Sequence, residues 1–364
     1  MRRSFPLTNF FCHAIMETDS DMEVIMLSPT APVATAYRRV LNLIGWSLVI
    51  FLGLFSNITV VDQLFLTEFL TGTFGTAVSG VISAVAYMAP FILAGVLFYI
   101  FNRKTPTQPI RYNLKLSAVT PLLILGGLAV ITAAAYVNSW FCSLIGYEIP
   151  PEMLVSEGYD DPSIIIMYMT TALAPAFAEE FLFRGVIYGN LRPFGKTQAI
   201  LISSALFALM HQNIGQTFYT FVGGVAMALM YELTGNIWCS ILFHLFNNEL
   251  SVLTEVLYYG KYGEAIEPLL MLWDAIVLVL GLVSILFLVF YYKRKSDQVK
   301  TDAGASVFGV CEDRDVSVYD APVDRQAIVR GLKAPGMVVF TAMAIASALI
   351  TYLVILFADL EALL

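Results

Sequence analysis

The chain has 364 residues, of which 58% are hydrophobic and 13% are charged, and its mean hydropathy is +0.76. This balance lies far outside that of water-soluble domains, so the composition indicates a polytopic membrane protein, and we expect no nucleic-acid partner. The formal net charge of −8 says little about partners, because the sidedness of charged loops matters more than their sum in such a protein.

The four cysteines give no sign of a disulfide framework or of a metal knuckle, because they are scattered and form no CxxC pair. The N-terminal segment is polar and acidic, with no sustained apolar run after its first arginines. A cleaved signal peptide is therefore not expected.

Apolar runs near the length of a membrane-spanning helix recur along the chain, which predicts an all-α transmembrane bundle of about eight or nine spanning helices. The expected helices cover residues 40–61, 77–101, 116–137, 164–191, 198–212, 218–233, 237–257, 269–292 and 337–357.

These runs divide the chain into six segments. They are a polar N-terminal segment (1–36), N-terminal transmembrane helices (37–162), a central core (163–257), an eighth helix with its preceding loop (258–292), a polar loop (293–334) and a C-terminal helix (335–364). Most Lys and Arg residues fall in alternate loops. The positive-inside rule then predicts a multi-pass protein of the cell membrane with a cytoplasmic N-terminus.

The fourth expected helix carries three charges near its middle, Glu179, Glu180 and Arg184. One charge at the centre of a bilayer costs about 2.5–3.5 kcal/mol on insertion scales, so three together require a reason. Glu180 and Arg184 are four residues apart and can pair, which leaves Glu179 free. We expect an intramembrane active site, although the pair could also be only a structural tie between helices.

Three further polar side chains lie on other helices at a similar depth. Counted from the expected cytoplasmic face at 1.5 Å per residue, the depths span about 12–22 Å for Glu179, His211, His244 and Asn248. A lone histidine on an apolar face is more often a packing residue, but matching depths favour a shared site. We expect Glu232, near a helix end, and the isolated Asp274 to be structural.

Three motifs resemble those of the CAAX protease and bacteriocin-processing (CPBP) family, also called the type II CAAX prenyl endopeptidase or abortive-infection family. They are EEFLFRG (179–185), FALMH (207–211) and HLFNN (244–248), and GGVAMALMYELTGNIW (223–238) also fits the pattern. The resemblance covers about residues 163–257 and leaves the first three helices, the loop after Tyr292 and the last helix outside it.

The resemblance implies an intramembrane glutamic endopeptidase acting on membrane-associated or lipidated peptides. Glu179 would activate water, His211 would help to hold it, and His244 and Asn248 would stabilise the oxyanion. Glu180 and Arg184 would support them. No cofactor is implied by this reading. The alternative is a zinc enzyme with Glu179, His211 and His244 as ligands, since two histidines and a glutamate are adequate zinc ligands.

Other functions remain open. HExxH, GxSxG and a pair of membrane aspartates are all absent from the sequence, which disfavours other intramembrane proteases. A non-catalytic immunity or scaffold protein and a transporter with a Glu179, Glu180 and Arg184 relay are the alternatives, although no inverted repeat favours the transporter. For the protease, we expect a cavity that opens to the cytoplasm near Arg192, Lys196 and Asn236.

Overall fold

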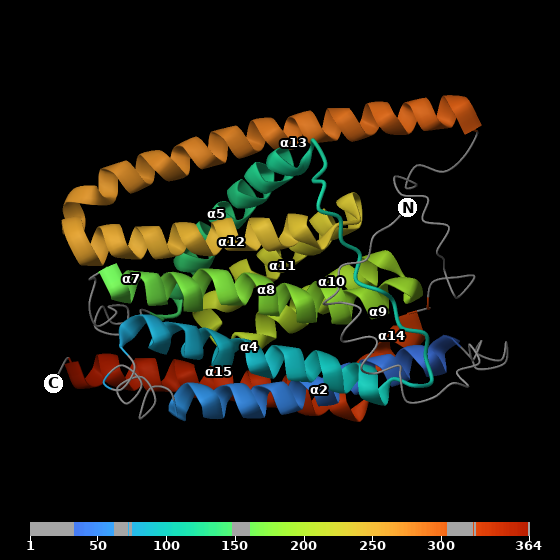
Figure 1. Cartoon of the computed structure of the whole chain (residues 1–364), viewed down its shortest axis with the longest axis horizontal. Coiled ribbons are helices and arrows are strands. Elements are labelled where there is room, and N and C mark those ends of the chain that lie inside the picture. The colour runs from blue at the N-terminus through green and yellow to red at the C-terminus, as the bar shows by residue number, and fades with distance from the viewer. Residues whose placement is uncertain are drawn as a thin grey trace.

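The computed structural model describes residues 33–61, 72, 75–147, 161–303, 323 and 325–362, and every regular element in these ranges is a helix (Figure 1). The prediction of an all-α polytopic bundle is confirmed. Residues 1–32 of the expected N-terminal segment, and 304–322 and 324 of the expected polar loop, lie outside the described residues.

All nine expected helices are present, with ends that differ by several residues. The main helices are α2 (Val33–Val61), α4 (Thr76–Phe101), α5 (Thr120–Leu144), α10 (Lys196–Met210), α11 (Ile214–Thr234), α12 (Ile237–Glu255), α13 (Glu267–Ala303) and α15 (Pro335–Ala362). The third helix begins later than expected, at Thr120, where Pro121 occupies the first turn and no backbone donor is lost. A short helix that the sequence did not predict, α14 (Arg325–Leu332), packs against α2.

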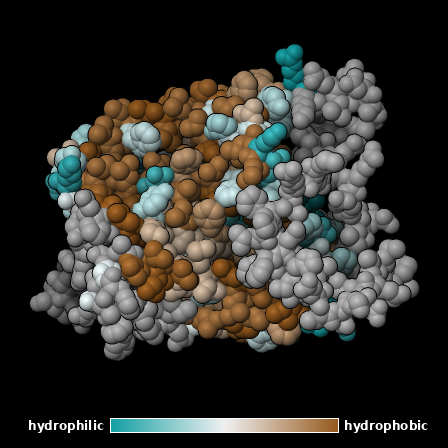
Figure 2. All heavy atoms as spheres, viewed as in Figure 1, coloured by the Kyte–Doolittle hydropathy of each residue, from teal (hydrophilic) through white to brown (hydrophobic). Residues whose placement is uncertain are grey.

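Six stretches of the described residues are long and apolar enough to cross a membrane, and the longest contains both α12 and α13. The chain is therefore a multi-pass membrane protein. Brown, hydrophobic side chains cover most of the described surface in Figure 2. Much of this surface belongs to α13, where Leu280, Val289 and Phe290 are exposed, as expected for side chains that face lipid.

The fourth expected helix is a composite of α-helical and π-helical turns. It runs through α7 (Asp161–Met167), η2 (Tyr168–Leu173), α8 (Ala174–Glu180), η3 (Phe181–Tyr188) and α9 (Gly189–Leu191), and a 3-10 turn, η4 (Arg192–Phe194), follows. Two of these pieces, η2 and η3, are π-helical and flank the α8 segment that ends with the two glutamates. Short π-helical stretches inside α-helices occur frequently at functional sites.

The two ends of the bundle differ in chemistry. At one end, which we call the basic end (right in Figure 1), the loop after α4 is tied to the start of α12, where the Ile237 amide donates to the Arg111 carbonyl (3.0 Å). At the other end, the far end, the Tyr147 hydroxyl donates to Asn213 (2.5 Å), which caps α11. At this far end α12 continues through η5 (Val256–Tyr262) and η6 (Gly263–Ile266) into α13. The active-site candidates lie between these two ends.

Candidate active site

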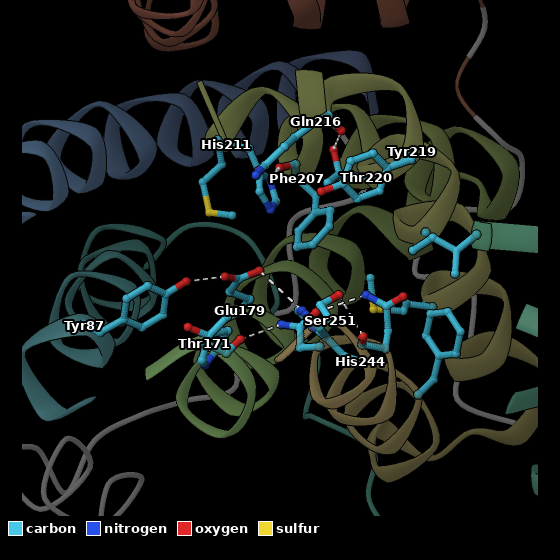
Figure 3. A pocket seen from close by; sticks show the side chains of 18 of the residues that line it. Tyr87, Thr171, Glu179, Phe207, His211, Gln216, Tyr219, Thr220, His244 and Ser251 are labelled. Carbon is cyan, nitrogen blue, oxygen red and sulfur yellow. Dashed lines mark hydrogen bonds and ion pairs between the residues drawn. The ribbon is translucent and has the colours of Figure 1, made fainter. Parts of the chain in front are cut away.

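A cavity of about 450 Å³ lies inside the bundle, and all four predicted site residues line it: Glu179, His211, His244 and Asn248. Figure 3 shows the labelled glutamate and both histidines pointing toward one another from α8, the end of α10 and α12. Phe55, Ile131, Met210, Met227 and Phe243 form apolar walls. The structure therefore brings together residues from three helices that the sequence placed only at similar depth.

Glu179 is nearly buried, with 3% of its surface exposed. Its Oε1 accepts a hydrogen bond from the Tyr87 hydroxyl of α4, and its Oε2 has no hydrogen-bond partner among the described residues. That second oxygen lies 3.8 Å from Nε2 of His244, beyond hydrogen-bond distance. One carboxylate oxygen is thus held in place while the other is left available in the cavity.

Glu180 and Arg184 form the predicted pair. The Arg184 Nη1 donates to the Glu180 Oε1 (2.8 Å), and both side chains are almost completely buried. Arg184 also donates to the Gly224 carbonyl of α11 (3.1 Å) and lies over the Phe207 ring at 4.5 Å. Because a guanidinium is planar and offers several donors, this one side chain ties η3, α11 and α10 together.

Glu180 has a second contact that the sequence did not indicate. Its Oε1 also lies 3.1 Å from the Nδ1 of His244, so one carboxylate oxygen receives both an arginine and a histidine. A carboxylate on one ring nitrogen fixes the orientation of an imidazole and leaves the other nitrogen for chemistry. The Nε2 of His244 is accordingly the atom that faces Glu179.

His211 follows the last residue of α10 and is oriented by its own backbone. Its Nδ1 contacts the Phe207 carbonyl at 2.8 Å, which leaves Nε2 for the cavity. The Phe207 ring makes edge contacts with both imidazoles, at centroid distances of 4.9 Å to His211 and 5.9 Å to His244. Phe207 therefore spaces the two histidines across the cavity.

The side chain of Asn248 already has two hydrogen-bond partners. Its Nδ2 donates to the Thr171 carbonyl of η2 (3.0 Å), and its Oδ1 accepts from Asn247 (3.1 Å). An amide nitrogen carries two hydrogens, so one donor remains for an oxyanion.

Tyr87, which donates to Glu179, is the site residue that the sequence did not predict. It lies outside the segment that resembles the family, and an apolar helix offers no pattern that singles out one tyrosine.

The expected opening near Arg192, Lys196 and Asn236 is wrong, because none of these residues lines the cavity. Glu232 binds Arg192 and Lys196 in a closed cluster at the basic end: it accepts from Tyr188 (2.5 Å), from Arg192 (2.7 Å) and from Lys196 (2.8 Å). Asn236 is 3% exposed and accepts from the Asn113 amide. The exposed residues that line the cavity, Thr171 and Ser251, lie toward the far end.

Glu232 and Asp274 are structural, as expected. Glu232 belongs to the basic-end cluster, and Asp274 accepts a hydrogen bond from Tyr136 (2.6 Å) between α13 and α5. Neither carboxylate lines the cavity.

Within the described residues, no group of three or more His, Cys, Asp or Glu side chains is arranged to hold a metal ion. His244 approaches a carboxylate with each ring nitrogen, and His211 uses Nδ1 on a carbonyl. The zinc alternative therefore lacks a ready ligand set here, and metal independence remains a prediction.

Residues 161–250 match the model of the family described as type II CAAX prenyl endopeptidase Rce1-like. This segment contains all six residues that the sequence singled out. This segment of the chain is therefore similar to the Rce1-like family. Over 105 residues the chain is also 29% identical to the "Putative membrane peptidase YdiL" of Bacillus subtilis (strain 168).

The similarity to that relative is partial: it covers 28% of this chain and 42% of the relative, so the chain spans less than half of the protein it matches. No solved structure matches the chain. The cavity residues Tyr87, Phe55 and Ile131 come from helices outside the matched segment.

The buried ion pair predicts a difference in stability between two alanine variants. Arg184→Ala leaves the charged Glu180 without its arginine, and breaking a buried pair typically costs about 3–5 kcal/mol, whereas Glu179→Ala removes a carboxylate that pairs with no Lys or Arg among the described residues. We expect a lower thermal midpoint for Arg184→Ala than for Glu179→Ala in detergent. Equal midpoints would mean that the pair adds no stability. Arg184→Lys tests the geometry, because it keeps the charge but cannot reach both Glu180 and Gly224 in the same way.

Proposed function

We propose that this chain is an intramembrane endopeptidase that hydrolyses peptide bonds of membrane-associated or lipidated peptides. The observation that carries the proposal is the Glu179 carboxylate oxygen with no hydrogen-bond partner among the described residues, in a cavity that two imidazoles share. Peptide hydrolysis needs a base to activate water and donors where negative charge develops.

In this proposal Glu179 accepts a proton from water, and the resulting hydroxide attacks the peptide carbonyl. The His211 Nε2, left free by the Phe207 carbonyl, orients the water. The His244 Nε2, when protonated, and the second amide hydrogen of Asn248 donate to the oxyanion. The proton on Glu179 then passes to the leaving amine. Every step uses this chain's own side chains, so no cofactor is part of the proposal.

Glu180 and Arg184 act as positioning residues in this scheme. Glu180 holds the Nδ1 of His244, and Arg184 holds Glu180. Glu179 and Glu180 are neighbours in sequence but have different surroundings, since among the described residues only Glu180 forms an ion pair with an arginine. That difference favours one catalytic and one structural carboxylate over a relay of both, as a transporter would require. A non-catalytic scaffold would need the ion pair but not a second carboxylate that lines the cavity.

One prediction concerns Glu179 and His244, which both line the cavity. Glu179→Gln and His244→Ala should each lower cleavage by at least about 10²-fold, the scale lost when a base or an oxyanion donor is removed. The measurement compares membrane peptides that accumulate in cells expressing each variant with those in wild-type cells, and then assays the accumulating peptide with purified protein. Glu264→Gln, an exposed acid of the far end, is the matched control and should behave as wild type. Normal turnover in Glu179→Gln, with expression unchanged, would show that Glu179 is not the base. If no peptide accumulates with either variant, only the scaffold or transporter functions are left.

Tyr87 offers a second test, because it holds the Glu179 carboxylate through one hydroxyl. Tyr87→Phe keeps the ring, which packs against Phe91 and Phe55, and removes only that donor. We expect kcat to fall about tenfold, the equivalent of about 1.4 kcal/mol, with little change in KM or in thermal midpoint. A change confined to KM would instead assign Tyr87 to substrate binding.

A further prediction concerns the removal of metal ions. Glu179 can activate water by itself, so cleavage by purified protein should survive strong chelators at full rate. Loss of activity on chelation, restored by added zinc, would replace this mechanism with a metal-bound water held by Glu179, His211 and His244.

A further inference from the structure

The basic end and the far end of the bundle carry opposite charges. The described basic residues gather at the basic end, among them Arg38, Arg103, Lys104, Lys196, Arg294 and Arg330. At the far end, the described turn from α12 to α13 carries Lys261 together with Glu255, Glu264 and Glu267. Loops rich in Lys and Arg remain on the cytoplasmic side of a membrane. The charge distribution therefore assigns the basic end to the cytoplasm.

The cavity is closed toward this basic end. Its floor is formed by Met227 and Phe243, which are 2% and 0% exposed. Below the floor, Tyr188, Tyr231 and Asn236 are buried around Glu232 and its partners. The Arg111 guanidinium lies over the Tyr231 ring, 4.8 Å from its centroid, and adds another side chain to this closed end.

The cavity is open toward the far end. Ser251 is fifteen residues beyond Asn236 on α12, about 22 Å by helical rise, and it is exposed on the cavity wall. Thr171, also exposed, faces it from η2 and accepts the Asn248 hydrogen bond across the rim. Thr170, Gln216 and Asn247 add hydrogen-bonding side chains to the same part of the lining.

We infer that the cavity takes its peptide from the non-cytoplasmic side of the membrane. The inference rests on the proposed endopeptidase function and adds a substrate class to it. The substrate is a membrane peptide whose cleaved bond lies in the outer half of the bilayer or just outside it. Its extended backbone meets the polar rim, and its apolar side chains meet Phe55, Ile131 and Met210.

Cysteine labelling in cells tests both parts of the inference. The background lacks the native cysteines (Cys12, Cys142, Cys239 and Cys311), and a membrane-impermeant maleimide is added to intact cells and, separately, to permeabilised cells. We expect Ser251→Cys at the rim and Glu264→Cys at the far end to label in intact cells. Lys104→Cys, exposed at the basic end, should label only after permeabilisation.

Two outcomes overturn the inference in different ways. Labelling of Lys104→Cys in intact cells, with Glu264→Cys protected, inverts the membrane orientation. External labelling of Glu264→Cys with a Ser251→Cys that stays unreactive until the cells are permeabilised means that the cavity does not open at the far end.

Labelling does not depend on catalysis, which separates this inference from the proposed function. The same cysteines are therefore also tested with Glu179→Gln, and the pattern should be unchanged. If labelling follows expectation but no membrane peptide accumulates in Glu179→Gln cells, the endopeptidase function fails while the orientation of the cavity stands. If peptides accumulate but Ser251→Cys labels only from the cytoplasm, the function stands and the side of entry is wrong.

Discussion

The contact between Glu180 and Arg184 is the interaction on which the rest of the site depends. Two charges removed from water inside an apolar bundle are tolerated only when they are paired and further hydrogen-bonded. Arg184 meets this requirement through Glu180 and the Gly224 carbonyl, and Glu180 meets it through Arg184 and His244. The same contacts connect four helical segments. This one set of contacts therefore both fixes the geometry of the cavity and neutralises the buried charge.

The pair also explains how two adjacent glutamates acquire different properties. Successive residues on a helix point about 100° apart, so Glu180 turns toward the arginine while Glu179 turns into the cavity. Glu179 contacts a tyrosine and, at 3.8 Å, a histidine, but no lysine or arginine among the described residues. A carboxylate without a paired cation in a partly dry cavity is suited to accept a proton, which is what the proposed hydrolysis requires.

Much of this arrangement follows from sequence. Apolar run length located the helices, and the i,i+4 spacing of Glu180 and Arg184 located the pair. Similar depth along their helices placed Glu179, His211 and His244 in one layer of the membrane, because helical rise is nearly constant. Tyr87 could not be found in this way, since its role depends on how α4 packs against α8. The opening of the cavity was mispredicted for a related reason: depth along a helix does not reveal which end the surrounding side chains close, and the Glu232 cluster closes the basic end.

The central claim is that Glu179 acts as a base on water and does not itself attack the peptide. A single-turnover cleavage in ¹⁸O-enriched water, with the product examined by mass spectrometry, tests this most directly. Direct attack by water predicts that the new C-terminal carboxylate carries ¹⁸O in the first turnover. A first-turnover product with only ¹⁶O, together with ¹⁸O on the Glu179 side chain, would show covalent attack by the glutamate and contradict the account.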